Sequence, residues 1–364
     1  MTIGEGMSEG VGDSATKAAA PQGLAVLLSR LIETECGLGC RVANLGPMED
    51  GHAGLTFGFD VVNRTGRPLS SYVLKLAPVG VTRRGSTDVY RQVPLLRGLK
   101  AVGMPVPAVR WAAQDDGLLG APFIIMERLP GRVFVVWEPH GSFSRQQIEL
   151  REVWLQAARM MAKLHKVEWR KALPDWELPR PLKEELDRWT PLLRHARDEA
   201  WRTAGAELYA LLVTHFPDGQ PIGIVHGDFQ PGNILYVSGR AEALIDWELA
   251  SIGSQGLDVG WLLMMSDGQA WDPSWRPVAP VSPQDLVDAY RDAGGRAFRD
   301  LEWYQALAHY RLGAIACLNE KLHRTGQRTD SLWERFIPSI ATLFARGIEL
   351  ASRAAKRSSA RSMT

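Results

Sequence analysis

The feature that most constrains the fold of this chain is a polar stretch flanked by two short apolar runs, "GIVHGDFQPGNIL", at residues 223–235. Its proline and glycine disfavour a helix and favour a loop between two strands. Asp228 and Asn233 are separated by four residues, and Asp246 ends the next predicted strand, "EALID". A hairpin of this length could bring Asp246 back beside Asn233. The pattern therefore predicts an active-site loop.

The side chains of this loop suit metal binding and proton transfer. A carboxylate and an amide oxygen form a good ligand set for Mg²⁺, which favours few protein ligands together with substrate phosphates. We expect Asn233 and Asp246 to bind Mg²⁺ and Asp228 to contact an incoming hydroxyl. We interpret the ring of His226 as a group that holds the shape of the loop rather than as a base or metal ligand. Glu248 fits either a second metal or a salt bridge.

The order H-x-D-x-x-x-x-N followed by a later Asp is typical of protein-kinase-like phosphoryl-transfer enzymes, with "IDWE" in place of D-F-G. Such enzymes also need a lysine on an upstream strand. Lys75 in "SYVLKLAP" alternates with apolar neighbours, so we expect it to project into an interlobe cleft and pair with nucleotide phosphates. Before it, Gly51 and Gly54 in "MEDGHAGLTFGF" allow a loop whose backbone N–H groups approach the phosphates.

Together these segments resemble the aminoglycoside phosphotransferase and choline kinase-like family of small-molecule kinases. The chain is similar in particular to the branch that includes the kinase-like domain of certain acyl-CoA dehydrogenase fusion proteins. The resemblance spans roughly residues 45–265 and is carried by "GHAGLTF", "YVLKLAP", "MPVPAV", "GAPFIIMERLPG", "LHKVEW", "VHGDFQPGNILY", "LIDWELASIG" and "GLDVGWLL". It implies an α+β, bilobal protein kinase-like fold that binds ATP or GTP, with Mg²⁺, between its lobes.

The resemblance also implies roles for residues outside the loop. Glu127 and Leu129 in "IIMERLPG" would offer backbone groups to the adenine, and Asp258 would brace the catalytic loop through its backbone. The chain departs from the family at Gln92, which we align with a glutamate that pairs with the strand lysine. An amide can still hydrogen-bond Lys75, but it orients an ammonium less strongly than a carboxylate does.

The length, composition and hydrophobic periodicity of the sequence predict two lobes and two tails. A length of 364 residues exceeds what one hydrophobic core usually organises. We predict a disordered tail at 1–20, a nucleotide-binding lobe with an antiparallel sheet and one helix at 21–130, a mainly helical catalytic and acceptor-binding lobe at 131–357, and a tail at 358–364. Helices are predicted at 145–168, 182–216, 255–266, 283–294, 300–325 and 330–357.

Composition limits the partners and the compartment. A net charge of +1 gives no argument for nucleic-acid or membrane partners. No apolar run reaches the roughly 18 residues that span a bilayer, and the N-terminus lacks the pattern of a secretory signal. Cys36 and Cys40 lack nearby residues to complete a metal site, so we interpret the cysteines as free thiols. We therefore expect a cytoplasmic protein.

The resemblance implies that the acceptor is recognised by the helices after Asp246, at residues 263–357. Aminoglycosides are polycations and need acidic pockets, but residues 306–364 contain four acids and ten bases. The acids are Glu320, Asp330, Glu334 and Glu349; the bases are Arg311, Lys321, Arg324, Arg328, Arg335, Arg346, Arg353, Lys356, Arg357 and Arg361. This excess favours a neutral or anionic small-molecule hydroxyl acceptor, such as a hydroxyacyl thioester. The segment "GQAWDPSWRPVAP" suits the wall of an apolar acceptor site.

Three alternatives remain open at this level. Within the kinase class, the acceptor could be an antibiotic, either an aminoglycoside or a macrolide. The departure at Gln92 is compatible with a nucleotide-binding pseudokinase that lacks transferase activity. A metal-dependent hydrolase could instead use His226, Asp228 and Asp246 as ligands, although it would need further histidines near the site.

Overall fold

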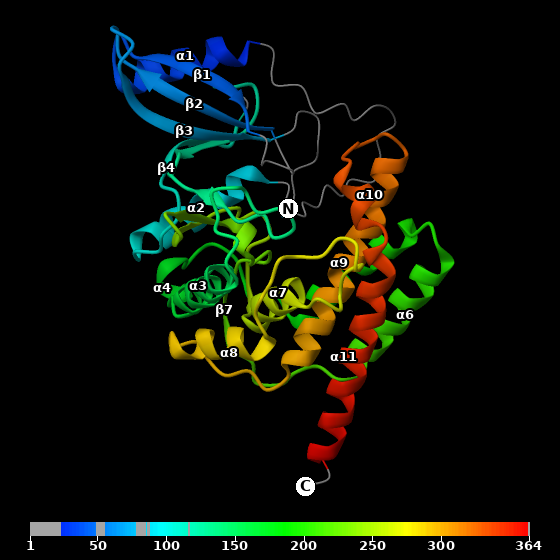
Figure 1. Ribbon diagram of the computed structural model, residues 1–364. Helices are drawn as coiled ribbons and strands as arrows, with labels where there is room; N and C mark the ends of the chain where they lie inside the picture. The colour runs from blue at the N-terminus through cyan, green and yellow to red at the C-terminus, as the bar shows by residue number, and fades with distance from the viewer. Residues whose placement is uncertain (1–22, 49–54, 78–84, 86–87, 116, 363–364) are drawn as a thin grey trace. The chain divides into compact units, whose positions relative to one another are not determined.

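The computed structural model describes residues 23–48, 55–77, 85, 88–115 and 117–362, with side chains up to residue 358. Contacts divide the chain into two compact units (Figure 1). The first unit runs to Pro130 and also contains the short segment Ala243–Leu249, and the second unit contains Gly131–Glu242 and the chain from Ala250 onward. A segment of the second half of the sequence, including Asp246, therefore belongs to the first unit.

The first unit is built on a five-stranded antiparallel sheet in the order β1-β2-β3-β5-β4. Its elements are α1 (Leu24–Cys36), β1 (Arg41–Pro47), β2 (Leu55–Val62), β3 (Pro68–Leu76), η2 (Val89–Arg91), α2 (Gln92–Ala101), β4 (Val109–Ala113) and β5 (Phe123–Glu127). Helix α1 packs its apolar stripe, including Leu28 and Ile32, against the sheet residues Phe59, Leu74 and Leu76. Side chains alternate between the two faces of a strand, so Lys75, between Leu74 and Leu76, points to the face opposite α1.

Helix α2 follows directly on a capped 3₁₀ turn. The side chain of Asp88 caps this turn by accepting a hydrogen bond from the N–H of Tyr90 at 3.0 Å. Gln92, the first residue of α2, is buried with an exposed fraction of 3%.

The second unit is mainly helical and carries two small sheets. Its strands are β6 (Arg132–Val133), β7 (Ile222–Val225), β8 (Ile234–Val237), β9 (Arg240–Leu244) and β10 (Ser251–Ser254), and β9 ends in the first unit. Its helical elements are α3 (Gln147–His165), α4 (Trp169–Ala172), α5 (Leu182–Asp187), η3 (Thr190–His195), α6 (Glu199–Thr214), η4 (Pro231–Asn233), α7 (Gly256–Ser266), α8 (Pro283–Asp292), α9 (Leu301–Arg324), α10 (Leu332–Phe336) and α11 (Ser339–Ser362).

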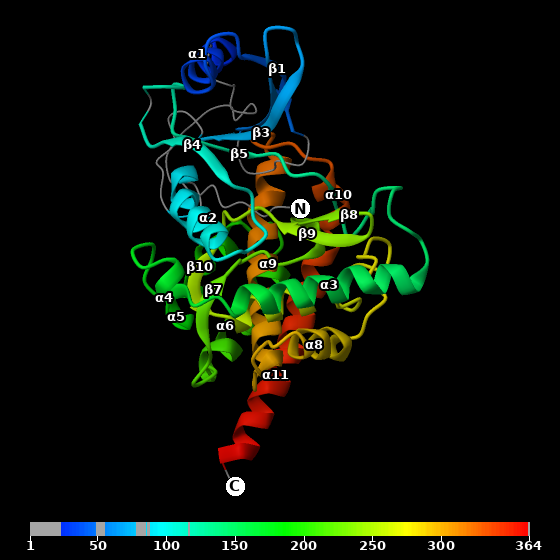
Figure 2. The ribbon, with the colours of Figure 1, turned by 90° about the vertical axis from the view of Figure 1, so that its left-hand side faces the viewer.

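Helix α9 forms the centre of the second unit and is buried along most of its length. It contacts α7, α6 and α11, and both views show α11 running beside it (Figures 1 and 2). Helix α7 approaches it closely at Gly260, where an added Cβ would lie 2.4 Å from the carbonyl oxygen of Tyr304. Only glycine fits there, and this close packing fixes α7, which carries Asp258 and Trp261, against the core.

Two predicted helices are interrupted in the structure. The helix predicted at 182–216 is divided into α5, η3 and α6, with Pro191 in the first turn of η3. The helix predicted at 330–357 breaks at Pro338 into α10 and α11. A proline lacks the N–H of the helical ladder and clashes with the preceding turn, so it ends or restarts a helix. Strand β10, "SIGS", was not predicted and pairs antiparallel with β7.

The predicted α+β class is confirmed, with an antiparallel sheet early in the chain and a helical part after it. Within the described residues, no helix is both long and apolar enough to cross a membrane.

Candidate active site

Lys75 lies in the middle of the first unit's sheet. It is paired in register with Thr56 on β2 and Ile124 on β5, on the face opposite the α1 core. Its Nζ donates to Asp246 Oδ1 at 3.2 Å and to Glu248 Oε1 at 3.1 Å. The side chains of all three residues are at most 15% exposed. Lys75, Asp246 and Glu248 therefore form a partly buried ion-pair cluster.

These ion pairs determine the charge of Lys75. Burial alone would lower the pKa of the ammonium, but the negative charges of Asp246 and then Glu248 outweigh that effect, and the pKa is raised above its usual 10.5. Lys75 is thus a fixed positive charge at any physiological pH. Its carboxylate partners come from "IDWE", whereas the aligned helix position holds the neutral Gln92.

The segment that carries Asp246 and Glu248 is tied to the first unit at both ends. The N–H of Leu244 donates to Pro105 O at 2.8 Å, and Arg91 Nη1 donates to Glu248 O at 3.3 Å. Asp246 itself has a φ of 65°, in the left-handed region that non-glycine residues seldom adopt. The backbone is therefore strained at Asp246. Such strained residues are often found at functional sites.

The other predicted nucleotide contacts are placed as follows. Gly51 and Gly54 lie outside the described residues. Glu127, the last residue of β5, uses its N–H to donate to Ala108 O at 2.9 Å, while its carboxylate pairs with Lys100 at 2.7 Å. A nucleobase could use the Glu127 N–H only by replacing the first of these bonds. Leu129 follows at the end of the first unit and is partly buried.

In the second unit, the loop between β7 and β8 is held from below by Asp258. The Asp258 carboxylate is fully buried near the N-terminus of α7 and accepts the N–H of His226 and the N–H of Gly227, each at 2.8 Å. Gly227 has a φ of 87°, which glycine adopts without steric cost. His165 Nε2 lies 3.2 Å from the same carboxylate. The contacts of Asp258 with the loop are therefore with its backbone, the type of contact that the resemblance implies.

The His226 ring is a local element of the loop. Its Nδ1 accepts the N–H of Asp228 at 3.3 Å, and its ring lies edge-on to Phe229 with centroids 5.7 Å apart. The ring is fully buried. These contacts maintain the turn that presents Asp228.

The Asp228 carboxylate is held by neutral donors. Its Oδ1 accepts from Gln230 Nε2 and from Trp261 Nε1, both at 2.8 Å, and its Oδ2 accepts from Asn233 Nδ2 at 3.0 Å. The residue is 1% exposed. Several donors on one carboxylate fix its orientation and favour its ionised form without an ion pair from these three side chains.

Trp261 connects this carboxylate to a buried charged network. The Arg311 guanidinium carbon lies 4.6 Å from the ring centroid of Trp261 and 4.4 Å from that of Trp189, so the cation is in contact with both rings. Trp189 Nε1 in turn donates to Glu185 Oε1 at 3.1 Å. Burial would raise the pKa of Glu185, but Arg188, Arg311 and Arg180 outweigh it and lower the pKa. The indole that orients Asp228 is therefore itself held by a buried cation.

Asn233 ends the short turn η4 and directs its amide nitrogen inward. Besides Asp228 Oδ2, its Nδ2 donates to the Asp228 backbone carbonyl at 2.7 Å. With the nitrogen used in this way, the amide oxygen is the atom of Asn233 suited to a cation. No group of three or more His, Cys, Asp or Glu within the described residues forms a metal site on its own. A metal at Asn233 would thus depend on a small set of oxygen donors, which suits Mg²⁺.

Comparison of the sequence with models of protein families identifies the family of this chain. The model for the phosphotransferase enzyme family matches residues 54–307, which include Lys75, the β7–β8 loop and Asp258. The chain belongs to this phosphotransferase enzyme family. This membership confirms the family resemblance that was inferred from the sequence motifs.

Relatives of this phosphotransferase differ in length. It is 25% identical over 317 residues to the probable acyl-CoA dehydrogenase IBR3 of Arabidopsis thaliana, covering 76% of this chain and 38% of that protein. The chain thus spans well under half of that relative. It is 30% identical over 219 residues to homoserine kinase of Chelativorans sp., covering 55% of this chain and 62% of the kinase.

Solved structures share the fold. A Ralstonia eutropha JMP134 chain assigned to the aminoglycoside phosphotransferases superposes with a TM-score of 0.71 at 20% identity, covering 90% of this chain and 98% of that one. A ternary complex of aminoglycoside phosphotransferase APH(4)-Ia with AMP-PNP and hygromycin B gives a TM-score of 0.57 at 15% identity, covering 90% and 98%. At these identities the likeness concerns the fold alone.

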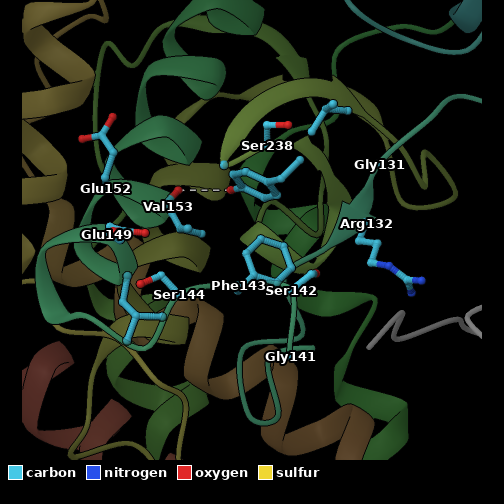
Figure 3. A pocket seen from close by; sticks show the side chains of 14 residues that line it. Gly131, Arg132, Gly141, Ser142, Phe143, Ser144, Glu149, Glu152, Val153 and Ser238 are labelled. Atoms are coloured by element: carbon cyan, nitrogen blue, oxygen red, sulfur yellow. Dashed lines mark hydrogen bonds between the residues drawn. The ribbon is translucent and has the colours of Figure 1, made fainter.

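The second unit of this phosphotransferase also contains a pocket of about 850 Å³ (Figure 3). It is lined by β6, the loop at 141–144, the start of α3 and the β8–β9 turn, and its lining does not include Asp228 or Asn233. Glu149 and Glu152 of α3 lie on one side of it and Arg132 on the other (Figure 3). Its mixed polar lining gives no indication of one ligand class.

Sequence reasoning left the role of one residue open and did not single out another. Glu248 fitted either a metal or a salt bridge, and the structure shows the salt bridge to Lys75. The indole of Trp261, which the sequence analysis did not name, donates to Asp228. Its position three residues after Asp258 was an available signal, because residues three apart share a helix face.

Proposed function

We propose that this protein is a Mg²⁺-dependent small-molecule kinase that transfers the γ-phosphoryl group of ATP to a hydroxyl of a neutral or anionic metabolite, such as a hydroxyacyl thioester. Family membership supports phosphotransferase chemistry. The observation that carries the proposal is the Asp228 carboxylate, buried on a braced loop and held by three neutral donors. Such a group is oriented to receive a proton.

In the reaction we propose, Asp228 orients the acceptor hydroxyl and takes its proton. The hydroxyl oxygen forms a bond to the γ-phosphorus as the bond to the β,γ-bridging oxygen breaks, and ADP departs with that electron pair. Lys75 binds the nucleotide phosphates, exchanging its contacts with Asp246 and Glu248 for contacts with phosphate oxygens. Asp258 and His226 keep the loop in shape. Catalysis then derives from positioning and charge stabilisation.

The residues fit a divalent cation. We assign Asn233, through its amide oxygen, and Asp246, through its carboxylate, as the protein ligands, because hard oxygen donors are what Mg²⁺ prefers. When bound, Mg²⁺ neutralises charge on the β- and γ-phosphates. This assignment also explains the ion pair of Asp246 with Lys75, which keeps the carboxylate charged and placed before nucleotide binds.

The choice of ATP and of acceptor class has separate support. Two structural neighbours are complexes with the adenine nucleotides AMP-PNP and ADP, which supports ATP, and a third is a complex with GDP. A relative named homoserine kinase suggests an amino-acid-sized acceptor, and the basic excess of residues 306–364 disfavours a polycation. Aminoglycoside or macrolide phosphorylation is the second candidate, because structural neighbours carry those names.

The test is ADP release by the purified chain with MgATP and a panel of acceptors: a hydroxyacyl thioester, homoserine, choline, kanamycin and erythromycin. We expect turnover with a neutral or anionic acceptor, none without Mg²⁺, and none for Asp228→Ala. MgATP binding by Asp228→Ala should match that of the parent. Turnover of kanamycin above all others would replace our acceptor class with the antibiotic one.

A pseudokinase is distinguished in the same assay. It would bind MgATP but release no ADP with any acceptor, and Asp228→Ala would change nothing. The intact Asp228, Asn233 and Asp246 oppose this reading. Lys75, whose partner was in doubt because of Gln92, has two carboxylate partners.

A further inference from the structure

Three tryptophans of the second unit form one aromatic cluster, which we call the tryptophan triad: Trp137, Trp271 and Trp275. The rings of Trp137 and Trp275 are stacked, with centroids 5.0 Å apart and an interplanar angle of 13°. Trp271 meets Trp137 edge-on at 5.2 Å and 86°. Trp137 follows β6, whereas the other two lie in the irregular segment between α7 and α8.

The indole nitrogens of the triad differ from the other buried indoles of this unit. All three are buried and have no hydrogen-bond partner within the described part of the chain, and the residues are 2–7% exposed. Four other buried indoles of this unit do donate: Trp154 to Val278 O, Trp189 to Glu185 Oε1, Trp261 to Asp228 Oδ1 and Trp303 to Leu212 O. A buried donor without a partner is costly, so three in one cluster call for an explanation.

The triad is linked to the catalytic loop through the strand that carries Trp137. Strand β6 pairs with β8, and the next residue, Phe134, donates its N–H to Pro231 O in the loop at 3.4 Å. Val136 O then accepts the N–H of Val278 at 2.7 Å, which brings in the segment after Trp275. Trp137 is thus three residues along the chain from Phe134, which is bonded to the loop that presents Asp228.

The faces of the Trp275 ring are already occupied. One face of Trp275 is covered by Trp137, and the guanidinium carbon of Arg335 lies 5.0 Å from the same ring centroid. Arg335 also pairs with Glu138. A quaternary ammonium or aminoglycoside would need those faces and would be repelled by Arg335. The indole N–H groups of the triad lack hydrogen-bond acceptors within the described residues. Oxygen atoms, with their lone pairs, are suitable acceptors.

We propose that the tryptophan triad binds the acceptor through its carbonyl or carboxylate oxygens. The ligand class is a hydroxylated acyl compound, with oxygen acceptors at the indole N–H groups. This inference rests on the proposed function, since it concerns the acceptor of the same reaction. It selects acyl-bearing acceptors and excludes polycations.

The first arm of the test measures thermal unfolding and needs no ligand. Trp271→Phe and Trp275→Phe remove an N–H and keep an aromatic ring, and Trp303→Phe is the matched control because its N–H is bonded to Leu212 O. We expect the control to lower Tm by about 2–4 °C and the two triad variants to leave Tm unchanged or raise it, because they remove a donor without a partner. If Tm falls as much in the triad variants as in the control, the proposal is overturned. The indole N–H groups of Trp271 and Trp275 would then already have hydrogen-bond partners in the parent protein.

The second arm measures ADP release with the N-acetylcysteamine thioester of 3-hydroxybutyrate, which lacks the phosphates of coenzyme A, and with kanamycin. We expect the thioester to be the better acceptor and its KM to rise about tenfold in Trp271→Phe and Trp275→Phe, with the KM for MgATP unchanged. Equal KM for thioester in parent and triad variants, or preference for kanamycin, overturns this inference while the kinase proposal stands. Absence of ADP release with every acceptor defeats the kinase proposal instead, and the unfolding arm then decides the triad by itself.

Discussion

Lys75 in the first unit and Asp228 in the second are both partly or fully buried charges, but their surroundings compensate them differently. Lys75 is in contact with the carboxylates of Asp246 and Glu248. Asp228 receives hydrogen bonds from two amides and an indole. An ion pair fixes a charge, whereas neutral hydrogen-bond donors fix the orientation of a carboxylate. The difference suits Lys75 to exchanging anions and Asp228 to accepting a proton.

The largest effect should come from removing the charge of Asp228. Asp228→Asn keeps the shape and loses the proton acceptor, so we expect kcat to fall by about 10³-fold, the size of general-base contributions. Steady-state ADP release checks it. A fall in kcat of less than tenfold would mean that Asp228 does not act as the proton acceptor.

The support beneath the loop should matter for stability as well as rate. Asp258→Ala leaves the N–H groups of His226 and Gly227 without their acceptor, so the free energy of unfolding should fall by at least about 2 kcal/mol. Urea unfolding measures this loss. Asp272→Ala is the control, because Asp272 accepts bonds from Ser274 within its own turn. Equal losses in both variants would contradict the bracing role of Asp258.

A smaller effect is expected from the indole on Asp228. Trp261→Phe removes one of the donors to Oδ1, so the carboxylate is less favoured and less well oriented. We expect kcat to fall about tenfold, equivalent to about 1.4 kcal/mol, and the acid limb of the pH–rate profile to move to higher pH. Trp303→Phe should leave the position of that limb unchanged. Loss of activity without movement of the limb would indicate a merely structural role for Trp261.

The smallest effect concerns the pH dependence of the Lys75 cluster. Because the folded pKa of Lys75 lies above its ordinary 10.5, its stabilisation is complete below that pH and is lost only as pH rises toward the folded value. The stability difference between the parent and Lys75→Met should therefore stay constant between about pH 6 and pH 9. Lys100→Met, which removes an exposed ion pair with Glu127, should cost less at every pH. A stability difference that declines across this range would contradict the raised pKa.

The comparison also shows what sequence can reveal. The strand alternation around Lys75 and the spacing of Asp228, Asn233 and Asp246 are local patterns, and they predicted the fold class and the chemistry. The partners of these groups come from far along the chain: Glu248 is 173 residues from Lys75, and Trp261 is 33 residues from Asp228. Such pairings depend on tertiary packing, which no local period records.

Helix boundaries gave a similar lesson. The apolar rhythm at 182–216 continues through Pro191, so the pattern alone predicted one helix where the structure has three shorter elements. Strand β10 is short and made of small residues, and its pairing with β7 is what defines it. Helix α9, which carries strong periodicity, was predicted to within one residue at each end.

The most direct test of the division of labour between Asp228 and Asp246 is a calorimetric titration of MgATP into two variants, Asp228→Asn and Asp246→Asn. We predict that Asp228→Asn binds MgATP with the affinity of the parent although it no longer turns over, and that Asp246→Asn loses the Mg²⁺-dependent part of binding. Loss of MgATP binding in Asp228→Asn, or Mg²⁺-dependent binding retained in Asp246→Asn, would contradict the account.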